Sequence, residues 1–208
     1  MNGRLTLDPH INEFLGLLHK DHISSFLVTN AQHPDALRTL TKPTQLYVSI
    51  DASNKDSLKA IDRPLFKDFW ERTLECLDIL RERQSQLRSV YRFTLVKGFN
   101  MDEIHGYGGL VDRGRPWLIE IKGILDPLLR KGRLSVGVTY CGKSDESSLT
   151  MGNVPFYDEV VEFAQGIIKE LNRRRTEIED LPEYAIAAEH AHRSFPPYRP
   201  IIIFKAYD

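Results

Sequence analysis

Cysteine is nearly absent from this chain, and that scarcity already limits its chemistry. Only Cys76 and Cys141 occur in 208 residues, far apart and in no metal-binding spacing. The sequence therefore predicts no metal site of its own. Cys76 lies on the apolar side of an expected helix, so we expect a buried free thiol there. Both cysteines fit a reducing, cytoplasmic setting.

Long apolar runs and an excess of charge of one sign are missing too. No run approaches membrane-spanning length, and the N-terminus lacks the basic-then-apolar pattern of a secretory signal. The formal net charge is -1, which argues against binding DNA or another nucleic acid through bulk electrostatics. A basic triplet, Arg173-Arg174-Arg175, is expected at the solvated end of a helix, although a local basic patch there stays open.

What remains is an ordinary globular composition with alternating short segments. The chain is 41% hydrophobic and 27% charged, and it is long enough to bury a core. Strands are expected over 25–28, 46–50, 90–96, 118–121 and 184–188, and 201–204 is a final apolar run. Helices are expected over 9–20 and 34–40, from 64 (the longest), from near 101 and around 160–171. Strands separated by helices predict an α/β fold, a partial parallel β/α barrel, with its site at the strand carboxyl ends.

Polar residues end or follow most of these predicted strands. The segment Thr44–Pro64 is the clearest case, because strand 46–50 runs directly into Asp51-Ala52-Ser53 and then into a helix. A serine and a carboxylate there suit a ribose or another hydroxylated ligand, while helix capping is the commoner role. Parallel neighbouring strands would bring these polar residues to one rim: Thr29, Asn30, Ser49, Asp51, Thr94, Lys97, Asn100, Glu120 and Lys122.

Two charged residues alternate with apolar ones in the predicted strand 118–121 and its end. Glu120 and Lys122 share one face, opposite Ile119 and Ile121. A buried charge is costly without a partner. Either this face lines a barrel interior that holds a charged substrate, or the strand is an edge strand with one solvated face. The sequence favours neither.

Some of these residues also suggest specific chemistry. Lys97 or Lys122 could form a Schiff base with a keto acid if burial lowers the pKa of its amine, although a single lysine is more typically a surface charge. Glu189, His190 and His192 resemble a ligand cluster, but hydrogen-bonded structural histidines fit so short a pattern equally well.

Longer segments carry a resemblance to a known family. The chain contains SSFLVTNAQHP, TQLYVSIDAS, DRPLFKDFWER, YRFTLVKGFNMDEI, LIEIKG, VTYCG, SLTMGNVPFYDEVVEF and AAEHAH. Together these segments resemble the radical S-adenosylmethionine enzymes of wybutosine synthesis, the tRNA 4-demethylwyosine synthases. The resemblance runs from about Pro9 to His192 with one interruption.

This resemblance implies a tRNA-modifying lyase with a [4Fe-4S] cluster that cleaves S-adenosylmethionine to a 5′-deoxyadenosyl radical. Pyruvate carbons then condense with N1-methylguanosine in phenylalanine tRNA to give 4-demethylwyosine. In the full-length family a flavodoxin-like domain with FMN precedes the barrel. The resemblance implies that Ser49, Asp51, Thr94, Lys97 and Asn100 contact S-adenosylmethionine, and that Glu120, Lys122, Glu189, His190 and His192 lie near the substrate. From their place at the strand ends we expect Thr29 and Asn30 to bind the cofactor as well. The Schiff-base chemistry considered above makes Lys97 and Lys122 the expected catalytic residues.

The chain also departs from the family pattern. It has no CxxxCxxC loop to bind the cluster and no flavodoxin-like domain, and Gly3-Arg4-Leu5 stands where the family has Gly-Glu-Pro. Residues 124–137 interrupt the pattern, and RSFPPYRPIIIFKAYD replaces a Ser-Asn-Cys segment after His192. These jumps suggest a truncated or mis-spliced product.

Four segments follow from these breaks. Residues 1–123 are expected to form a partial radical SAM barrel truncated at its N-terminus, and 124–137 an atypical insertion. Residues 138–192 would be the wyosine-base-formation region and 193–208 a divergent tail, with insertion and tail loosely held. We expect the chain to be inactive alone. The alternatives are a non-catalytic remnant that binds tRNA or a partner, and an unrelated barrel enzyme with a Schiff-base lysine.

Overall fold

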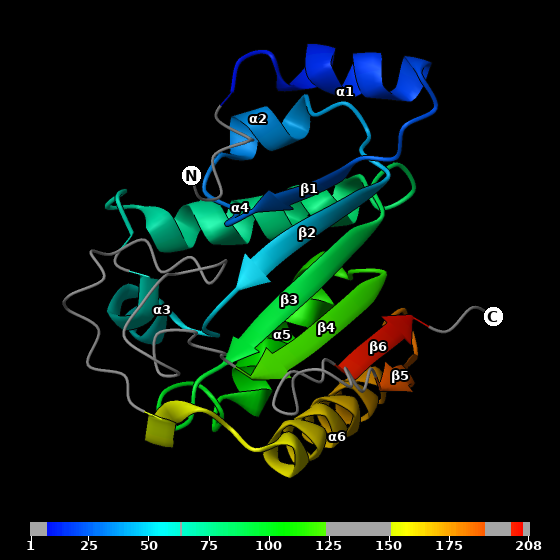
Figure 1. Ribbon diagram of the computed structural model, residues 1–208. Helices are drawn as coiled ribbons and strands as arrows, with labels where there is room; N and C mark the ends of the chain where they lie inside the picture. The colour runs from blue at the N-terminus through cyan, green and yellow to red at the C-terminus, as the bar shows by residue number, and fades with distance from the viewer. Residues whose placement is uncertain (1–7, 63, 124–150, 190–200, 206–208) are drawn as a thin grey trace.

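A single sheet organises the computed structural model, which describes residues 8–62, 64–123, 151–189 and 201–205 (Figure 1). Its order is β1 (Phe26–Thr29), β2 (Gln45–Ile50), β3 (Ser89–Leu95), β4 (Leu118–Gly123), β6 (Ile201–Lys205) and β5 (Tyr184–Glu189). The first four strands are parallel, which confirms the predicted β/α units. β6 runs antiparallel to both β4 and β5, an arrangement that the sequence did not predict.

Helices cover one face of this sheet. The described helices are α1 (Ile11–Lys20), α2 (Pro34–Arg38), α3 (Lys55–Asp62), α4 (Phe69–Glu82), α5 (Ile104–Gly114) and α6 (Tyr157–Arg175), with a 3-10 turn at Met151–Asn153. Figure 1 shows α4 and α5 behind the strands and α6 beside β6 and β5, while α1 and α2 lie beyond β1. The expectation that the helix after residue 64 is the longest was wrong. That helix begins only at Phe69 and has 14 residues, whereas α6 has 19 because its apolar stripe continues into an arginine-rich last turn.

The core lies between the sheet and these helices. Tyr91 and Phe93 of β3 point toward the helices and are fully buried. The Phe93 ring lies 4.6 Å from that of Tyr107 in α5, and the Tyr107 ring lies 5.6 Å from that of Phe163 in α6. Aromatic contacts of this kind add to the free energy of burying the rings. Because side chains alternate along a strand, the residues between the buried ones point to the other face of the sheet.

We call that other face, turned away from α4, α5 and α6, the polar face. It carries the half-buried side chains Tyr47 and Ser49 of β2, Arg92 and Thr94 of β3, and Glu120 and Lys122 of β4. The predicted alternation in β4 is confirmed, since Ile119 and Ile121 are fully buried on the helix side. The edge-strand interpretation of β4 was wrong, because β3 and β6 pair with its two sides.

Part of the predicted tail belongs to this sheet. Ile201 and Ile203 of β6 are 0% exposed, and the strand separates β4 from β5. The expectation of a loosely held tail was therefore wrong for residues 201–205. Their alternating isoleucines fill the core while the strand hydrogen-bonds on both sides. Three of the four predicted segments thus contribute strands to one sheet.

None of the described helices is long and apolar enough to cross a membrane.

Candidate functional site

The carboxyl-end half of the polar face gathers charged and hydroxyl side chains from three strands. Ser49 of β2, Arg92 of β3 and Glu120 of β4 lie at one level of the sheet, as Cα partners. Thr94 and Lys122 pair two residues further along, nearer the strand ends. Arg92 donates a hydrogen bond from Nη2 to Ser49 Oγ at 2.9 Å. These three strands are neighbours in Figure 1, so the two levels form one continuous surface.

A pair of carboxyl groups lies at the end of this surface. Asp51 directly follows β2 and lies on the same face of the sheet as Ser49. Asp62 is the last residue of α3. Burial and the neighbouring Asp51 carboxylate raise the pKa of Asp62 to about 8. Burial also raises the pKa of Asp51, opposed by a hydrogen bond with Thr94 and by the charges of Arg92 and Lys122. Asp62 therefore keeps its proton near neutral pH and can donate it.

Lys122 is the amine of this cluster. Burial lowers the pKa of its amine, and the positive charge of Arg92 lowers it further, against the opposing effect of Glu120 and Asp51. A lowered pKa increases the fraction of neutral amine near neutral pH, and the neutral amine is the form that attacks carbonyl carbons. The predicted condition for Schiff-base chemistry, a partly buried lysine, is met here.

Lys97, the other predicted catalytic lysine, lies in different surroundings. It follows β3 at the rim, where its Nζ pairs with Glu159 Oε1 of α6 at 2.5 Å and lies 5.4 Å from the Phe156 ring centroid. Its side chain is 42% exposed. Its role in catalysis stays a prediction, and this ion pair ties it to α6 rather than to the polar face.

Asn100 and Thr29, both predicted to bind cofactor, are buried and hydrogen-bonded within the protein. Asn100 donates to the carbonyls of Asp51 (2.7 Å) and Thr94 (2.9 Å) and accepts from the amide of Val96 (2.8 Å). Thr29 accepts a hydrogen bond from the amide of Ala31 at 3.2 Å. These contacts indicate that Asn100 fixes the ends of β2 and β3. Cofactor contact by either residue stays a prediction.

The remaining predicted positions are placed only in part. Asn30 is exposed directly after β1. The backbone of Glu189 ends β5, with its Cα opposite Ile201, which in turn is opposite Ile121 of β4. Glu189 therefore belongs to the same sheet edge as the cluster. His190 and His192 lie outside the described residues.

The turn after β2 is fixed by a residue that the sequence did not suggest. Glu103, which precedes α5, accepts hydrogen bonds from the amide (2.9 Å) and hydroxyl (2.8 Å) of Ser53. Asn54 Nδ2 at 2.8 Å and the Ser57 hydroxyl also donate to it. The two polar residues of the Asp51-Ala52-Ser53 turn thus have different roles, because Ser53 stabilises the turn while Asp51 faces the polar cluster.

Arg92 and Asp62 were also missed by the sequence interpretation. A signal for Arg92 was available, because it alternates with Tyr91 and Phe93 just as Glu120 alternates with isoleucines. For Asp62 no local signal existed, since only the tertiary path of α3 brings it to Asp51.

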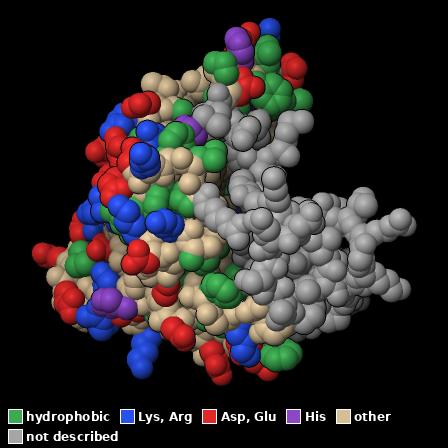
Figure 2. Space-filling view, turned by 90° about the vertical axis from the view of Figure 1, so that its left-hand side faces the viewer, with side chains coloured by type: hydrophobic (Ala, Val, Ile, Leu, Met, Phe, Trp, Pro, Cys, Tyr) green, Lys and Arg blue, Asp and Glu red, His purple; other side chains and the backbone are tan. Residues whose placement is uncertain are grey.

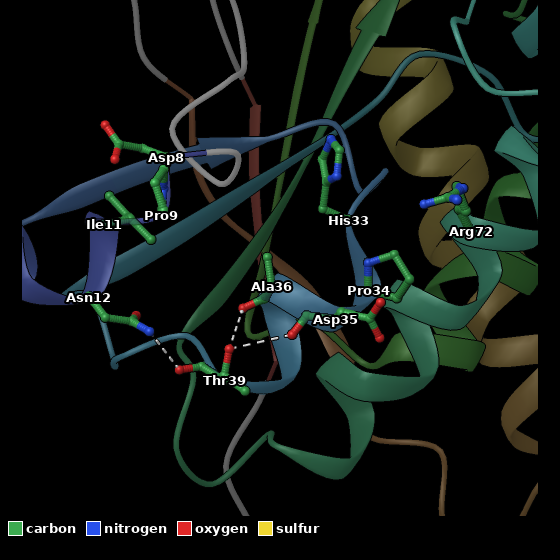
Figure 3. Close-up of a pocket in the computed structure, with 10 residues that line it drawn as sticks. All are labelled: Asp8, Pro9, Ile11, Asn12, His33, Pro34, Asp35, Ala36, Thr39 and Arg72. Carbon is green, nitrogen blue, oxygen red and sulfur yellow. Dashed lines mark hydrogen bonds between the residues drawn. The ribbon is translucent and has the colours of Figure 1, made fainter.

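A separate pocket of about 350 Å³ lies between α1, α2 and α4 (Figure 3). His33, Pro34 and Arg72 lie along one side, and Asn12 hydrogen-bonds to the Thr39 carbonyl across from them. None of the predicted site residues lines it. We therefore locate the candidate site on the polar face instead.

The described part of the surface seen in Figure 2 carries Lys and Arg side chains interspersed with Asp and Glu. At the α6 end, Arg173 pairs with Glu170 (3.0 Å) and Glu177 (2.7 Å), and Arg175 with Glu183 (2.8 Å). Arg173 and Arg175 are therefore solvated at the helix end as predicted. Arg174 is only 16% exposed, pairs with Glu170 at 2.8 Å and donates to the His105 carbonyl of α5 at 3.1 Å.

The iron–sulfur cluster implied by the family resemblance does not fit the residues of this chain. Three cysteine thiolates would have to bind it, and the sequence has two cysteines. Cys76 is a buried free thiol, as predicted, and burial raises its pKa to about 12, which opposes thiolate formation. No cluster of His, Cys, Asp or Glu suited to a metal occurs among the residues that the structure describes.

Comparison with known families places the chain in the radical SAM class. Residues 3–107 match the radical SAM superfamily, and residues 136–195 match the family of wyosine base formation. The chain belongs to the radical SAM superfamily. The alternative of an unrelated barrel enzyme is thereby excluded.

Curated relatives narrow the family further. The chain is 55% identical over 185 residues to the S-adenosyl-L-methionine-dependent tRNA 4-demethylwyosine synthase of Schizosaccharomyces pombe, covering 88% of this chain and 24% of that relative. It is 51% identical to the Saccharomyces cerevisiae enzyme (91% and 21%) and 50% to the human one (91% and 22%). The chain is thus homologous to a segment of these synthases and spans about a quarter of their length.

Two solved structures share the fold. One, described as TYW1 with a lysine-pyruvate adduct bound, superposes with a TM-score of 0.71 at 24% identity and covers 96% of this chain and 53% of its own. The crystal structure of archaeal TYW1 gives 0.63 at 23% identity, with the same coverage. At this level of identity they support the architecture alone.

Proposed function

We propose that this chain provides the pyruvate-binding and tRNA-facing part of a tRNA 4-demethylwyosine synthase, acting in wybutosine biosynthesis. The observation that carries this proposal is Lys122, a partly buried lysine whose amine has a lowered pKa. It lies on the same face as Arg92 and the Asp51–Asp62 pair. The names of the relatives supply the tRNA substrate, and one solved relative carries a lysine-pyruvate adduct. A cytoplasmic location fits this substrate.

In this proposal Lys122 forms the pyruvate adduct. Its neutral amine adds to the C2 carbonyl, forming a carbon–nitrogen bond while one amine proton moves to the carbonyl oxygen. The Asp51–Asp62 pair then donates its proton, the oxygen leaves as water, and a protonated imine remains. Lys97 is disfavoured for this step because Glu159 holds its ammonium group at 2.5 Å.

The radical step needs groups that this chain does not hold. S-adenosylmethionine and the cluster supply the radical in this superfamily, and FMN would supply electrons in longer members. Ser49, Asp51 and Thr94 present hydroxyl and carboxylate groups at the strand ends that fit a ribose. Because three thiolates are lacking, we propose that the chain alone is inactive and that the full reaction needs residues outside this sequence.

Trapping with borohydride tests the lysine assignment. The chain is incubated with isotopically labelled pyruvate and sodium borohydride, and the modified peptide is identified by mass spectrometry. We expect one reduced pyruvate on Lys122, lost in Lys122→Arg and retained in the matched control Lys97→Arg. A label on Lys97, or no label at any lysine, would contradict the proposal.

The two-cysteine count favours a second candidate, a non-catalytic module that binds tRNA. Gel shifts with phenylalanine tRNA, with and without N1-methylguanosine, distinguish it. Methylation-dependent binding without pyruvate trapping would indicate the module, whereas trapping together with binding supports the synthase segment. Anaerobic incubation with iron and sulfide adds a check, since cluster absorbance would contradict the predicted inactivity.

A further inference from the structure

Arg92 has hydrogen-bonding capacity that its surroundings do not use. Its Nη2 donates to Ser49 Oγ at 2.9 Å, while its Nε is buried and has no hydrogen-bond partner among the described residues. An unsatisfied buried donor on a charged group costs free energy, so it needs an explanation. A ligand that accepts a hydrogen bond at this point would supply one.

The neighbouring carboxylate does not satisfy this guanidinium. Glu120 is the Cα partner of Arg92 on β4, yet its carboxylate makes no hydrogen bond to the buried Nε of Arg92. Ser49 fixes the guanidinium through one nitrogen. Guanidinium N–H groups form a planar fork that matches a carboxylate through two parallel hydrogen bonds. The available position on Arg92 therefore suits an anionic carboxylate of a ligand.

Arg92 is also well placed relative to the reactive amine. Thr94 lies two residues beyond Arg92 on the same face of β3, and Lys122 of β4 is the Cα partner of Thr94. With strands about 4.8 Å apart and a rise of about 3.3 Å per residue, Arg92 and Lys122 have Cα atoms roughly 8 Å apart, within reach of two long side chains. A small molecule between them can contact both tips. In a 2-oxo acid the carboxylate is bonded directly to the carbonyl carbon, so one molecule meets both requirements.

We infer that Arg92 binds the carboxylate of a 2-oxo acid and thereby places its carbonyl carbon against Lys122. This inference rests on the proposed function and deepens it, because it gives the residue that selects an acid over other carbonyl compounds. Bringing the guanidinium next to Lys122 has a second effect: its positive charge lowers the pKa of the lysine amine and favours the neutral form. Arg92 thus acts on both the ligand and the nucleophile.

The test compares pyruvate with methyl pyruvate, which keeps the ketone but has no carboxylate. Borohydride trapping on Lys122 is measured as a function of the concentration of each compound. In the wild-type chain we expect half-maximal labelling by pyruvate at a concentration lower by about tenfold or more, the size of one charged hydrogen bond. In Arg92→Gln the two concentrations should become equal. Using their ratio removes any general change in the reactivity of Lys122.

Two variants serve as controls. Arg88→Gln removes an exposed arginine just before β3 and should keep the wild-type ratio. Arg92→Lys keeps the charge without the fork and should give an intermediate ratio. An unchanged ratio in Arg92→Gln would overturn the inference while leaving the Lys122 assignment standing. No labelling of Lys122 in the wild type would overturn both. If neither Arg92 variant folds, equal labelling of the wild type by both compounds overturns the inference, and a tenfold preference for pyruvate supports it.

Discussion

At the scale of single residues, the Asp51–Asp62 pair ties stability to pH. The pKa of Asp62 is about 8 in the folded chain against an ordinary 3.8, because burial and the Asp51 carboxylate disfavour its charged form. Between about pH 4 and pH 8 the folded chain keeps a proton that the unfolded chain has lost. The contribution of Asp62 to the free energy of unfolding is therefore complete below about pH 4 and is lost as pH rises through 8.

Asp62→Asn should remove this dependence, because the amide stays neutral at every pH. We expect the free energy of unfolding of the wild type, relative to the variant, to fall by on the order of 1 kcal/mol per pH unit between about pH 4 and 8. Urea denaturation of both proteins across this range measures it. Asp56→Asn, at an exposed position of α3, is the matched control. A wild-type-minus-variant difference that does not change with pH would refute the raised pKa.

Single residues also show which members of the candidate site a local sequence pattern can identify. Period-two alternation identified Glu120 and Lys122, and it would have identified Arg92 had the same rule been applied to β3. It could not identify Asp62, which no local pattern connects to Asp51. Likewise, Asn100 is typical of a site residue in the sequence, and only its three hydrogen bonds show that it supports the backbone.

At the scale of elements, the connection from β3 to α5 depends on that asparagine. Asn100 joins the amide of Val96, the carbonyl of Thr94 and, across the sheet, the carbonyl of Asp51. It therefore holds the carboxyl ends of β2 and β3 in register at the point where the polar cluster begins. Gly98, in the same turn, has a φ of 81°, a conformation that glycine adopts without strain.

Asn100→Ala should destabilise the chain by about 2–4 kcal/mol, since a buried hydrogen-bond network loses its centre. Asn30→Ala, at an exposed position after β1, should change stability by less than about 0.5 kcal/mol. Chemical denaturation monitored by tryptophan fluorescence measures both. Equal stability of Asn100→Ala and wild type would show that Asn100 is not structural and would favour the predicted cofactor contact.

Individual elements were predictable because their signals are local. Short apolar runs marked the strands β1 to β5, and apolar residues at helical spacing marked α1, α4 and α6. Starting points were less accurate: the predicted helix near residue 101 begins at Ile104, because the preceding residues form the turn that Asn100 stabilises.

At the scale of the whole molecule, the last strand joins parts of the chain that are far apart in sequence. β6 lies between β4 and β5, so residues 201–205 connect the β/α units to the helix–strand unit of α6 and β5. No sequence rule predicted this position, because antiparallel pairing at such distance depends on the finished core. The run of isoleucines was visible in the sequence, but the strands that pair with it, β4 and β5, were not.

This arrangement predicts that the chain unfolds as one unit whose stability depends on β6. Ile203 is 0% exposed between β4 and β5, so Ile203→Ala should leave a cavity and cost about 2–5 kcal/mol. Ile23→Ala, at a residue that is 51% exposed, is the matched control and should cost under about 0.5 kcal/mol. Thermal unfolding followed by circular dichroism should show one transition in each protein, shifted to lower temperature only in Ile203→Ala. A wild-type-like transition in Ile203→Ala would mean that β6 does not pack in the sheet in solution. The link between the strands of the polar face and α6 would then be lost as well.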